Sequence, residues 1–401
     1  MSKDRHITRP AGFVAAGVKA GIKASGKEDL AIIASVAPAS AAVLTTRNQV
    51  FGEPVRYCRA VLPRGYGIVR GIVINSGCSN VCTGRAGYRD AHEMARLTAQ
   101  KLGCPPRQVL VASTGIIGHR LPMVRVRSGI ASAADSLGTA GDKPALRAIM
   151  TTDLREKYAV RKVRAGGREI TLAGMVKGSG MIAPSLATMI AVITTDARVS
   201  PQLLHRTLRN ACGKTFDAVT VDSDTSTSDT VIMLASGAAG NASLRPGSVD
   251  YDRFALTLLD LCDDLARQIA ADGEGATKFI SITVKGAKSQ SDASLAAKSV
   301  ANSPLFKCAV HGGDPNWGRI AAALGKSPAK VDPDKLSISI GGTKIFSAGR
   351  PRKFDLGTVE KHLAGPQVNV LADLGLGEAQ FTVYTCDLSR EYIAINADYH
   401  T

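Results

Sequence analysis

The chain has 401 residues, too many for one ordinary hydrophobic core and enough for two domains. Hydrophobic residues make up 45% of it and aromatic residues only 4%, so alanine, valine, isoleucine and leucine must fill the core. The formal charge of +16 comes from 50 basic and 34 acidic residues. Because the basic residues are scattered rather than gathered in an aromatic-rich patch, they argue against a nucleic-acid-binding protein.

The cysteines and the N-terminal segment bear on the cellular location of the protein and on whether it holds a metal. No histidine lies at zinc-finger spacing from the closest cysteine pair, Cys78 and Cys82, so we expect reduced thiols and no metal site. The segment MSKDRHITRPAGF lacks the apolar stretch of a signal peptide, and the most apolar segment, LAIIASVAPASAAVL, is too short to span a bilayer. These features predict a cytoplasmic protein that binds neither a membrane nor a nucleic acid.

Strands and helices are mixed along the chain, which predicts an α/β (mixed α+β) fold with two domains. Residues 66–77 and 107–115 are predicted strands that run into glycine-rich turns, and residues 91–103 are a predicted helix that ends at Gly103. After Ser248, a long helix that ends near Gly273 is predicted by an apolar stripe at steps of three or four residues: Phe254, Leu258, Leu261, Leu265 and Ile269.

The C-terminal third is predicted to contain mainly strands. Residues 278–286 and 335–346 alternate apolar and polar side chains, and a Gly-Gly turn divides the second segment. Residues 379–388 and 391–401 are also predicted strands. The C-terminus is therefore expected to be held in a sheet.

The stretch KGSGMIAPSLATMIAVITTDA, residues 177–197, joins a glycine- and serine-rich loop directly to an apolar strand. Pro184 favours extended backbone before the junction, and the run from Met189 is typical of a strand buried on both faces. Thr188 would lie at this junction, as an ordinary strand residue in the commoner case or as a nucleophile. A threonine hydroxyl needs a base, which its own α-amine supplies once the Ala187–Thr188 bond is cut.

This stretch closely resembles the signature of the ornithine acetyltransferase family, the bifunctional glutamate N-acetyltransferase/ornithine acetyltransferases of arginine biosynthesis. Further blocks resemble the family in the same order: STGIIGHRLPM, IMTTD, VDSDTSTSDT, DGEGATKFI, SPLFKCAVHGGDPNWGRIAAALG and INADYHT. The resemblance covers nearly the whole chain and implies self-cleavage between Ala187 and Thr188. The products would be an α chain, residues 1–187, and a β chain, residues 188–401, that stay associated as a heterotetramer of two α and two β chains.

The resemblance also implies the reaction. Thr188 would take the acetyl group from N2-acetylornithine, release ornithine and pass the acetyl group to glutamate, so that an acetyl-enzyme forms between the two halves of a ping-pong reaction. Acetyl-CoA is a possible acetyl donor, and no metal or organic prosthetic group is expected. The alternative is a self-cleaving threonine-dependent aminopeptidase or amidohydrolase, in which water accepts the acyl group.

Individual site residues follow from the same blocks. Thr114 and Gly115 match the oxyanion pair of the family, and a hydroxyl and a backbone N–H at a strand-to-glycine turn can donate to one developing oxyanion. Six positions match substrate contacts, with Thr151 left open as an alternative to the first: Thr152, Lys177, Thr188, Glu274, Asn396 and Thr401. On pattern alone, Lys177 is equally a solvated lysine, Glu274 a helix-end acid that faces water, and Asn396 a strand-end cap.

The chain departs from the family pattern at positions that carry no assigned chemistry: Cys78, Ser79, Ser223, Ser228, His311 and Gly313. These residues bear on hydrogen bonds around the site and therefore on substrate preference. The blocks VDSDTSTSDT and HGGDPNWGRI are rich in aspartate, asparagine, serine and threonine, a composition compatible with a metal or phosphate site. Turns whose side chains bond their own backbone next to the active site are the favoured interpretation.

Overall fold

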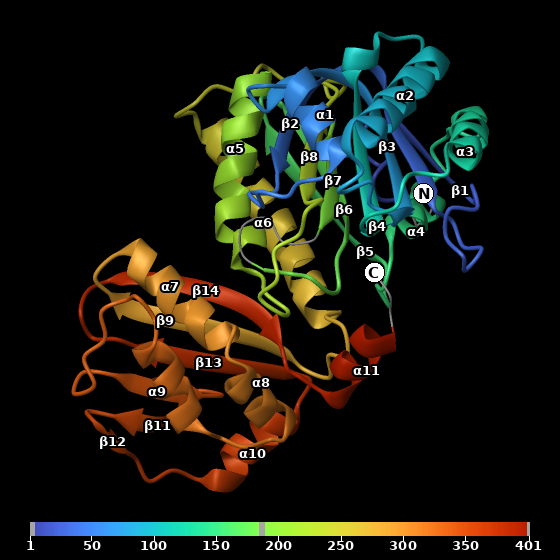
Figure 1. Ribbon diagram of the computed structural model, residues 1–401. Helices are drawn as coiled ribbons and strands as arrows, with labels where there is room; N and C mark the ends of the chain where they lie inside the picture. Colours follow the sequence, from blue (N-terminus) through green and yellow to red (C-terminus); the bar gives the residue numbers. More distant parts are fainter. Residues whose placement is uncertain (1–4, 184–188, 399–401) are drawn as a thin grey trace.

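The protein folds into two lobes, each built around one β-sheet (Figure 1). The structure, a computed structural model, describes residues 5–183 and 189–398. The larger lobe contains the chain through helix α6, Val249–Ala271, and the smaller lobe contains the elements from Phe279 to Cys386. The predicted mixed α/β fold is confirmed.

The sheet of the larger lobe has the strand order β4-β3-β2-β8-β7-β6-β5, and β1 pairs with β2 outside this path. The strands are β1 (Phe13–Val18), β2 (Leu30–Thr45), β3 (Tyr66–Cys78), β4 (Val109–Ile116), β5 (Lys157–Ala165), β6 (Arg168–Lys177), β7 (Ile190–Thr195) and β8 (Thr230–Ala235). β3 runs parallel to β4 and β7 parallel to β8. Every residue of β7 is buried, as its continuous apolar sequence predicts.

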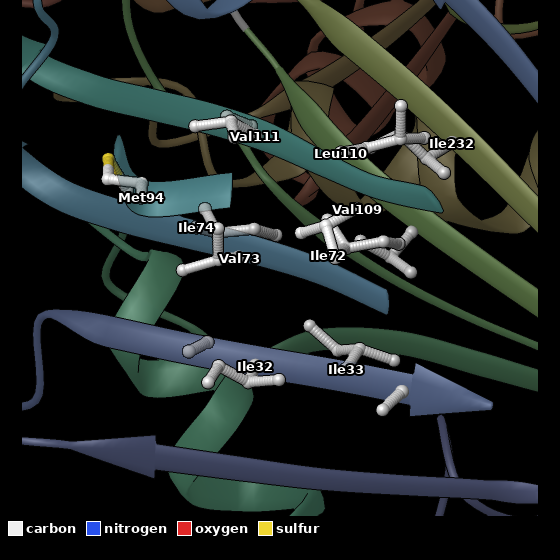
Figure 2. Close-up of a cluster of buried hydrophobic side chains, with 14 of the residues drawn as sticks. Ile32, Ile33, Ile72, Val73, Ile74, Met94, Val109, Leu110, Val111 and Ile232 are labelled. Atoms are coloured by element: carbon white, nitrogen blue, oxygen red, sulfur yellow. The ribbon is translucent and has the colours of Figure 1, made fainter. Parts of the chain in front are cut away.

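Helices cover both faces of this sheet. One core cluster joins the strands to α1 (Glu53–Val61), α2 (Gly84–Leu102), α3 (Met123–Asp135) and α4 (Asp142–Ile149). Figure 2 shows part of it, where isoleucine and valine side chains of β2, β3 and β4 gather with Met94 of α2. The other cluster contains α5 (Pro201–Lys214) and α6.

The two helices predicted most clearly are confirmed. α2 ends at Gly103, whose φ of 64° is the left-handed conformation that glycine adopts without strain. α6 begins after Ser248, whose hydroxyl accepts the backbone N–H of Tyr251. All five residues of its predicted apolar stripe are buried.

The sheet of the smaller lobe has the strand order β12-β11-β10-β13-β9-β14. Its strands are β9 (Phe279–Ala287), β10 (Ser337–Ile340), β11 (Thr343–Ser347), β12 (Arg350–Pro351), β13 (Gln367–Asp373) and β14 (Ala379–Cys386). Its helices are α7 (Gln290–Ala301), α8 (Pro304–His311), α9 (Trp317–Gly325) and α10 (Leu356–Ala364). Gly341 and Gly342, both with positive φ, form the predicted turn between β10 and β11.

The prediction of a strand over residues 391–401 is wrong for the described part, which is helix α11, Arg390–Asp398. The hydroxyl of Ser389 accepts the N–H of Glu391 and caps the helix start, a signal that the apolar pattern masked. No residue of α11 is buried, and Ile393 is 66% exposed, unlike the side chains of a strand held in a sheet. The helix instead returns from the smaller lobe to the loop that follows α6 (Figure 1).

All eight cysteines lie in the described ranges and are free thiols, five of them buried. Within residues 5–183 and 189–398, no cluster of metal-ligating side chains is found. The same ranges contain no helix with the length and apolarity needed to cross a bilayer.

Candidate active site

The described residues predicted to form the site all line one cavity of about 120 Å³. They come from the end of β4, the loop after α4, the end of β6, the loop after α6, and α11: Thr114, Gly115, Thr151, Thr152, Lys177, Glu274 and Asn396. We call this space the active-site cavity. Both threonines of the pair left open, 151 and 152, line it. The predictions for Ala187, Thr188 and Thr401 fall outside the described residues.

The turn at the end of β4 depends on close approach to β3. Gly115 pairs with Gly77 in the parallel register and has a φ of 120°. A Cβ atom on Gly115 would lie 2.5 Å from the carbonyl carbon of Gly77, so only glycine fits without moving the backbone. The buried hydroxyl of Thr114 lies at this turn and receives a hydrogen bond of 3.4 Å from Nζ of Lys177. The assignment of Thr114 and Gly115 as oxyanion donors stays a prediction.

Lys177 ends β6 inside the protein, and only 3% of it is exposed. Burial lowers the pKa of its ammonium group; the charges of Asp153, Glu274 and Asp229 oppose this shift, and Lys157 adds to it. The alternative of a solvated lysine does not hold. The side chain is a buried cation beside Thr114.

Glu274 and Asn396 meet across the cavity from distant parts of the sequence. Nδ2 of Asn396 donates to Oε2 of Glu274 at 2.9 Å. Glu274 is 8% exposed, so it is not a helix-end acid that faces water, and Asn396 lies on a helix rather than at a strand end. A Cβ atom on Gly180 would lie 2.2 Å from Oε2 of Glu274, so the carboxylate packs directly against the loop after β6.

A buried ion network behind the cavity was not predicted from the sequence. Nζ of Lys157 lies 2.7 Å from Oδ1 of Asp153 and 2.5 Å from Oδ2 of Asp272, and all three side chains are at most 3% exposed. Burial alone would raise the pKa of Asp153, but Lys157 and Lys177 together hold it down at about 2. The network therefore keeps Asp153 ionised although it is fully enclosed.

This network ties together three loops that carry site residues. Asp153, in the loop after α4, accepts the N–H of Gly178 at 2.7 Å, directly after β6. The carbonyl oxygen of Asp272 accepts the hydroxyl of Ser179 at 2.7 Å and so binds the same loop to the end of α6. Asp153 lies in the motif MTTD beside Thr152, and Asp272 lies in the motif DGEGATK near Glu274. Thr152 and Glu274 were predicted as site residues, but the two aspartates were not. Lys157 offers no comparable sequence signal.

Two aspartates hold the chain on either side of residues 184–188. Asp222 accepts the N–H groups of Met181 and Ile182 at 2.6 and 2.9 Å, and burial raises its pKa to about 6. Oδ1 of the buried Asp229 accepts the N–H of Met189 at 3.0 Å. The loop between the two aspartates lines the cavity through residues 226–228. Met189, the neighbour of Thr188, is thus fixed beside the cavity wall.

Two of the departures from the family pattern also line the active-site cavity. Ser79 lines the cavity, and its hydroxyl donates to the carbonyl oxygen of Ile116 at 2.8 Å. Ser228 lines the cavity from the loop between Asp222 and Asp229. Other departures lie elsewhere: His311 bonds Asp387 at 2.7 Å in the smaller lobe. Ser79 and Ser228 are therefore the departures that border the active-site cavity.

The chain is similar to known proteins over nearly its whole length. The ArgJ family profile matches residues 14–401. The arginine biosynthesis bifunctional protein ArgJ of Symbiobacterium thermophilum is 47% identical over 400 residues, 98% of each chain, and that of Geobacter sulfurreducens is 46% identical over 395 residues, 97% of this chain and 99% of the other. The crystal structure of ArgJ from Bacillus halodurans matches with 38% identity and a TM-score of 0.50, over 51% of this chain and 97% of the solved chain. The chain belongs to the ArgJ family.

Proposed function

We propose that this protein is the acetyltransferase of arginine biosynthesis that moves an acetyl group from N2-acetylornithine to glutamate, with Thr188 as nucleophile. The observation that carries the proposal is the convergence of Thr114, Lys177, Glu274 and Asn396 on one cavity. Met189, next to Thr188 in the chain, is anchored to the loop that lines the same cavity.

The first chemical step is self-cleavage. The hydroxyl oxygen of Thr188 attacks the carbonyl carbon of Ala187, the peptide C–N bond breaks, and an ester joins the two residues. Water hydrolyses this ester, which leaves a carboxylate on Ala187 and a free α-amine on Thr188. Asp222 and Asp229 support this step because they hold the backbone on both sides of the scissile bond.

Acetyl transfer then follows in two halves. The α-amine of Thr188 takes the hydroxyl proton as the oxygen attacks the acetyl carbonyl of N2-acetylornithine. The hydroxyl of Thr114 and the N–H of Gly115 donate to the oxyanion, the C–N bond breaks, and the departing ornithine amine receives the proton. The amine of glutamate attacks the acetyl-Thr188 ester in the reverse sense. The reaction needs no cofactor, because the chain and its substrates supply nucleophile, base and leaving group.

The charged residues of the cavity suit amino-acid substrates. The carboxylate of Glu274, held by Asn396, would pair with the side-chain ammonium of ornithine. The buried ammonium of Lys177 would bind a substrate carboxylate and lower the pKa of the Thr188 amine, which keeps that base unprotonated. Thr151 or Thr152 would add a hydroxyl contact. Acetyl-CoA as a second donor is a further part of the proposal.

The two products of cleavage are expected to stay together. β7 and β8 follow the cut, yet they lie in the sheet between β2 and β6, which precede it. Separation would expose strand edges and core side chains on both products. The match to the Bacillus halodurans structure covers 97% of the solved chain but only 51% of this chain, which is compatible with a cut near the middle of this chain. We extend the proposal to a heterotetramer of two α and two β chains, to be tested by native mass spectrometry.

The test is turnover of N2-acetylornithine with and without glutamate. We expect ornithine and N-acetylglutamate in equal amounts when glutamate is present, and little ornithine beyond one equivalent of enzyme when it is absent. Thr188→Ala should yield neither product. Ornithine released equally fast without glutamate would show hydrolysis and would replace acetyl transfer by the amidohydrolase alternative.

A further inference from the structure

A second cavity, of about 570 Å³, lies in the larger lobe between the end of β2, the turn before β3, and α5. Five basic side chains line it: Arg47, Arg59, Arg64, His205 and Arg209. We call it the basic cavity. It shares no lining residue with the active-site cavity, and its volume is in the range that holds a small organic molecule.

Basic side chains outnumber acidic ones among the described residues of the basic cavity, where Asp217 is the single carboxylate in the lining. Elsewhere the chain pairs exposed arginines, as Arg120 with Asp90 at 2.8 Å and Arg267 with Asp263 at 2.7 Å. Within the described residues, Arg64 and Arg209 make no ion pair and no side-chain hydrogen bond, and the same holds for Arg47. With several arginines against the one carboxylate of Asp217, the cavity keeps a surplus of positive charge for an anion from solution.

The other charged groups at the basic cavity leave its positive potential in place. Arg59 donates to the carbonyl oxygen of Thr46 at 2.6 Å and lies over a phenylalanine ring, so it is fixed by uncharged groups. Asp217 also lines the cavity, but its charge acts on Lys298 as well. Burial and the charge of Arg209 both lower the pKa of His205.

The floor of the basic cavity is apolar. Buried side chains from β2, α1, the residue after α1, and α5 form it, namely Val43, Leu44, Cys58, Leu62 and Cys212. Gly65 has a φ of 74°, and a Cβ atom there would lie 2.8 Å from Nε2 of His205, so the glycine lets α5 approach the turn. An arginine rim above an apolar floor suits a ligand with both an anionic and a ring or apolar part.

We propose that the basic cavity binds a small organic phosphate, with the phosphate groups at Arg64 and Arg209 and the organic part on the apolar floor. Guanidinium groups recognise phosphate through paired, charge-assisted hydrogen bonds. The phosphate-bearing ligand could be a free nucleotide or the nucleotide end of coenzyme A, since both present this chemistry. The proposal concerns binding and does not depend on acetyl transfer.

A short path of contacts joins the basic cavity to the active-site cavity. Thr46, whose carbonyl oxygen binds Arg59, donates its hydroxyl to the carbonyl oxygen of Ser226 at 2.6 Å and its N–H to that of Asp229 at 3.0 Å. Ser226 lines the active-site cavity, and Asp229 holds Met189. The two cavities are therefore linked through Thr46, which contacts Arg59 on one side and the loop of Ser226 and Asp229 on the other.

The test is isothermal titration of the purified, processed protein with ADP, coenzyme A and inorganic pyrophosphate. We expect ADP or coenzyme A to bind more tightly than pyrophosphate, because only they can use the apolar floor. The double substitution Arg64→Ala/Arg209→Ala should weaken that binding about 10-fold or more. The matched control, Arg245→Ala/Arg253→Ala, removes the same charge from exposed positions outside the cavity and should change the affinity less than about twofold.

Three results would overturn the proposal. The first is the absence of binding of ADP or coenzyme A at millimolar concentration. The second is equal weakening of binding by both double alanine substitutions, which would show that affinity depends only on the net charge of the protein. The third is loss of binding in Lys177→Met while Arg64→Ala/Arg209→Ala binds normally, which would put the ligand in the active-site cavity. The variant Arg64→Lys/Arg209→Lys keeps the charges and is expected to bind more tightly than the alanine variant. Preference for ADP or for coenzyme A identifies the source of the phosphate.

Discussion

The two cavities hold positive charge in opposite ways. In the active-site cavity, Lys177 is buried and its charge is balanced by Asp153 and Glu274. In the basic cavity, Arg64 and Arg209 are exposed and lack carboxylate partners within the described ranges. A buried charge is costly unless it is paired, whereas an exposed one costs little. Substitutions at the first cavity should therefore reduce stability and catalysis, and those at the second should reduce ligand binding alone.

The largest expected effect comes from breaking the buried ion network. Lys157→Met would leave Asp153 and Asp272 buried without their cation, and we expect a loss of about 3–5 kcal/mol in the free energy of unfolding. Urea denaturation measures it. The control is Lys101→Met, which breaks an exposed pair with Asp135 and should cost no more than about 1 kcal/mol. Equal losses in both variants would contradict the contrast between buried and exposed charge.

The next effect is on catalysis. Thr114→Val keeps the shape of the side chain and removes its hydroxyl, so kcat should fall about 10²–10³-fold if that hydroxyl stabilises the oxyanion. Steady-state assays of ornithine release measure the change. Thr98→Val is the matched control, since its buried hydroxyl has no hydrogen-bond partner in the described structure. An unchanged kcat in Thr114→Val would remove Thr114 from the oxyanion site.

The sequence predicted much of this arrangement. The apolar stripe from Phe254 to Ile269 identified α6, and the family motifs identified Thr114, Lys177, Glu274 and Asn396, which the fold brings to one cavity. It could not predict the network of Lys157, because an ion pair between loops depends on how the loops pack rather than on a local pattern.

The C-terminal helix shows a different limit of sequence analysis. Residues 391–398 have the short apolar run of a strand, but the segment is exposed and its structure is set by the cap at Ser389. Short apolar runs do not distinguish strand from helix without a partner surface. The basic cavity was missed for a related reason: Arg64 and Arg209 are far apart in the sequence and looked like scattered surface charge.

A smaller effect concerns pH. Asp222 has a pKa of about 6 in the folded protein, against an ordinary value of 3.8, because its partial burial outweighs the backbone hydrogen bonds it accepts, and the charge of Asp224 adds to the shift. Between about pH 4 and 6 the folded state therefore binds a proton that the unfolded state has lost, and the contribution of Asp222 to stability falls as pH rises through this window. Asp222→Asn should flatten the pH dependence of unfolding there by up to about 1 kcal/mol per pH unit. A profile identical to that of the unsubstituted protein would contradict the raised pKa.

The smallest effect is expected at the edge of the active-site cavity. Asn396 is exposed on α11 and gives Glu274 a single side-chain hydrogen bond. Asn396→Ala should raise KM for N2-acetylornithine by several-fold, about 1 kcal/mol, and leave kcat nearly unchanged. A fall in kcat as large as that of Thr114→Val would give Asn396 a role in the chemical step.

The most direct test of the central claim is intact-mass measurement of the protein before and after it reacts with N2-acetylornithine. The account predicts two fragments that meet at residue 188, with one added acetyl group on the 188–401 fragment that disappears when glutamate is supplied. The Thr188→Ala protein should remain one unmodified polypeptide. An uncut chain that still turns over N2-acetylornithine, or an acetyl group found only on the 1–187 fragment, would contradict the account.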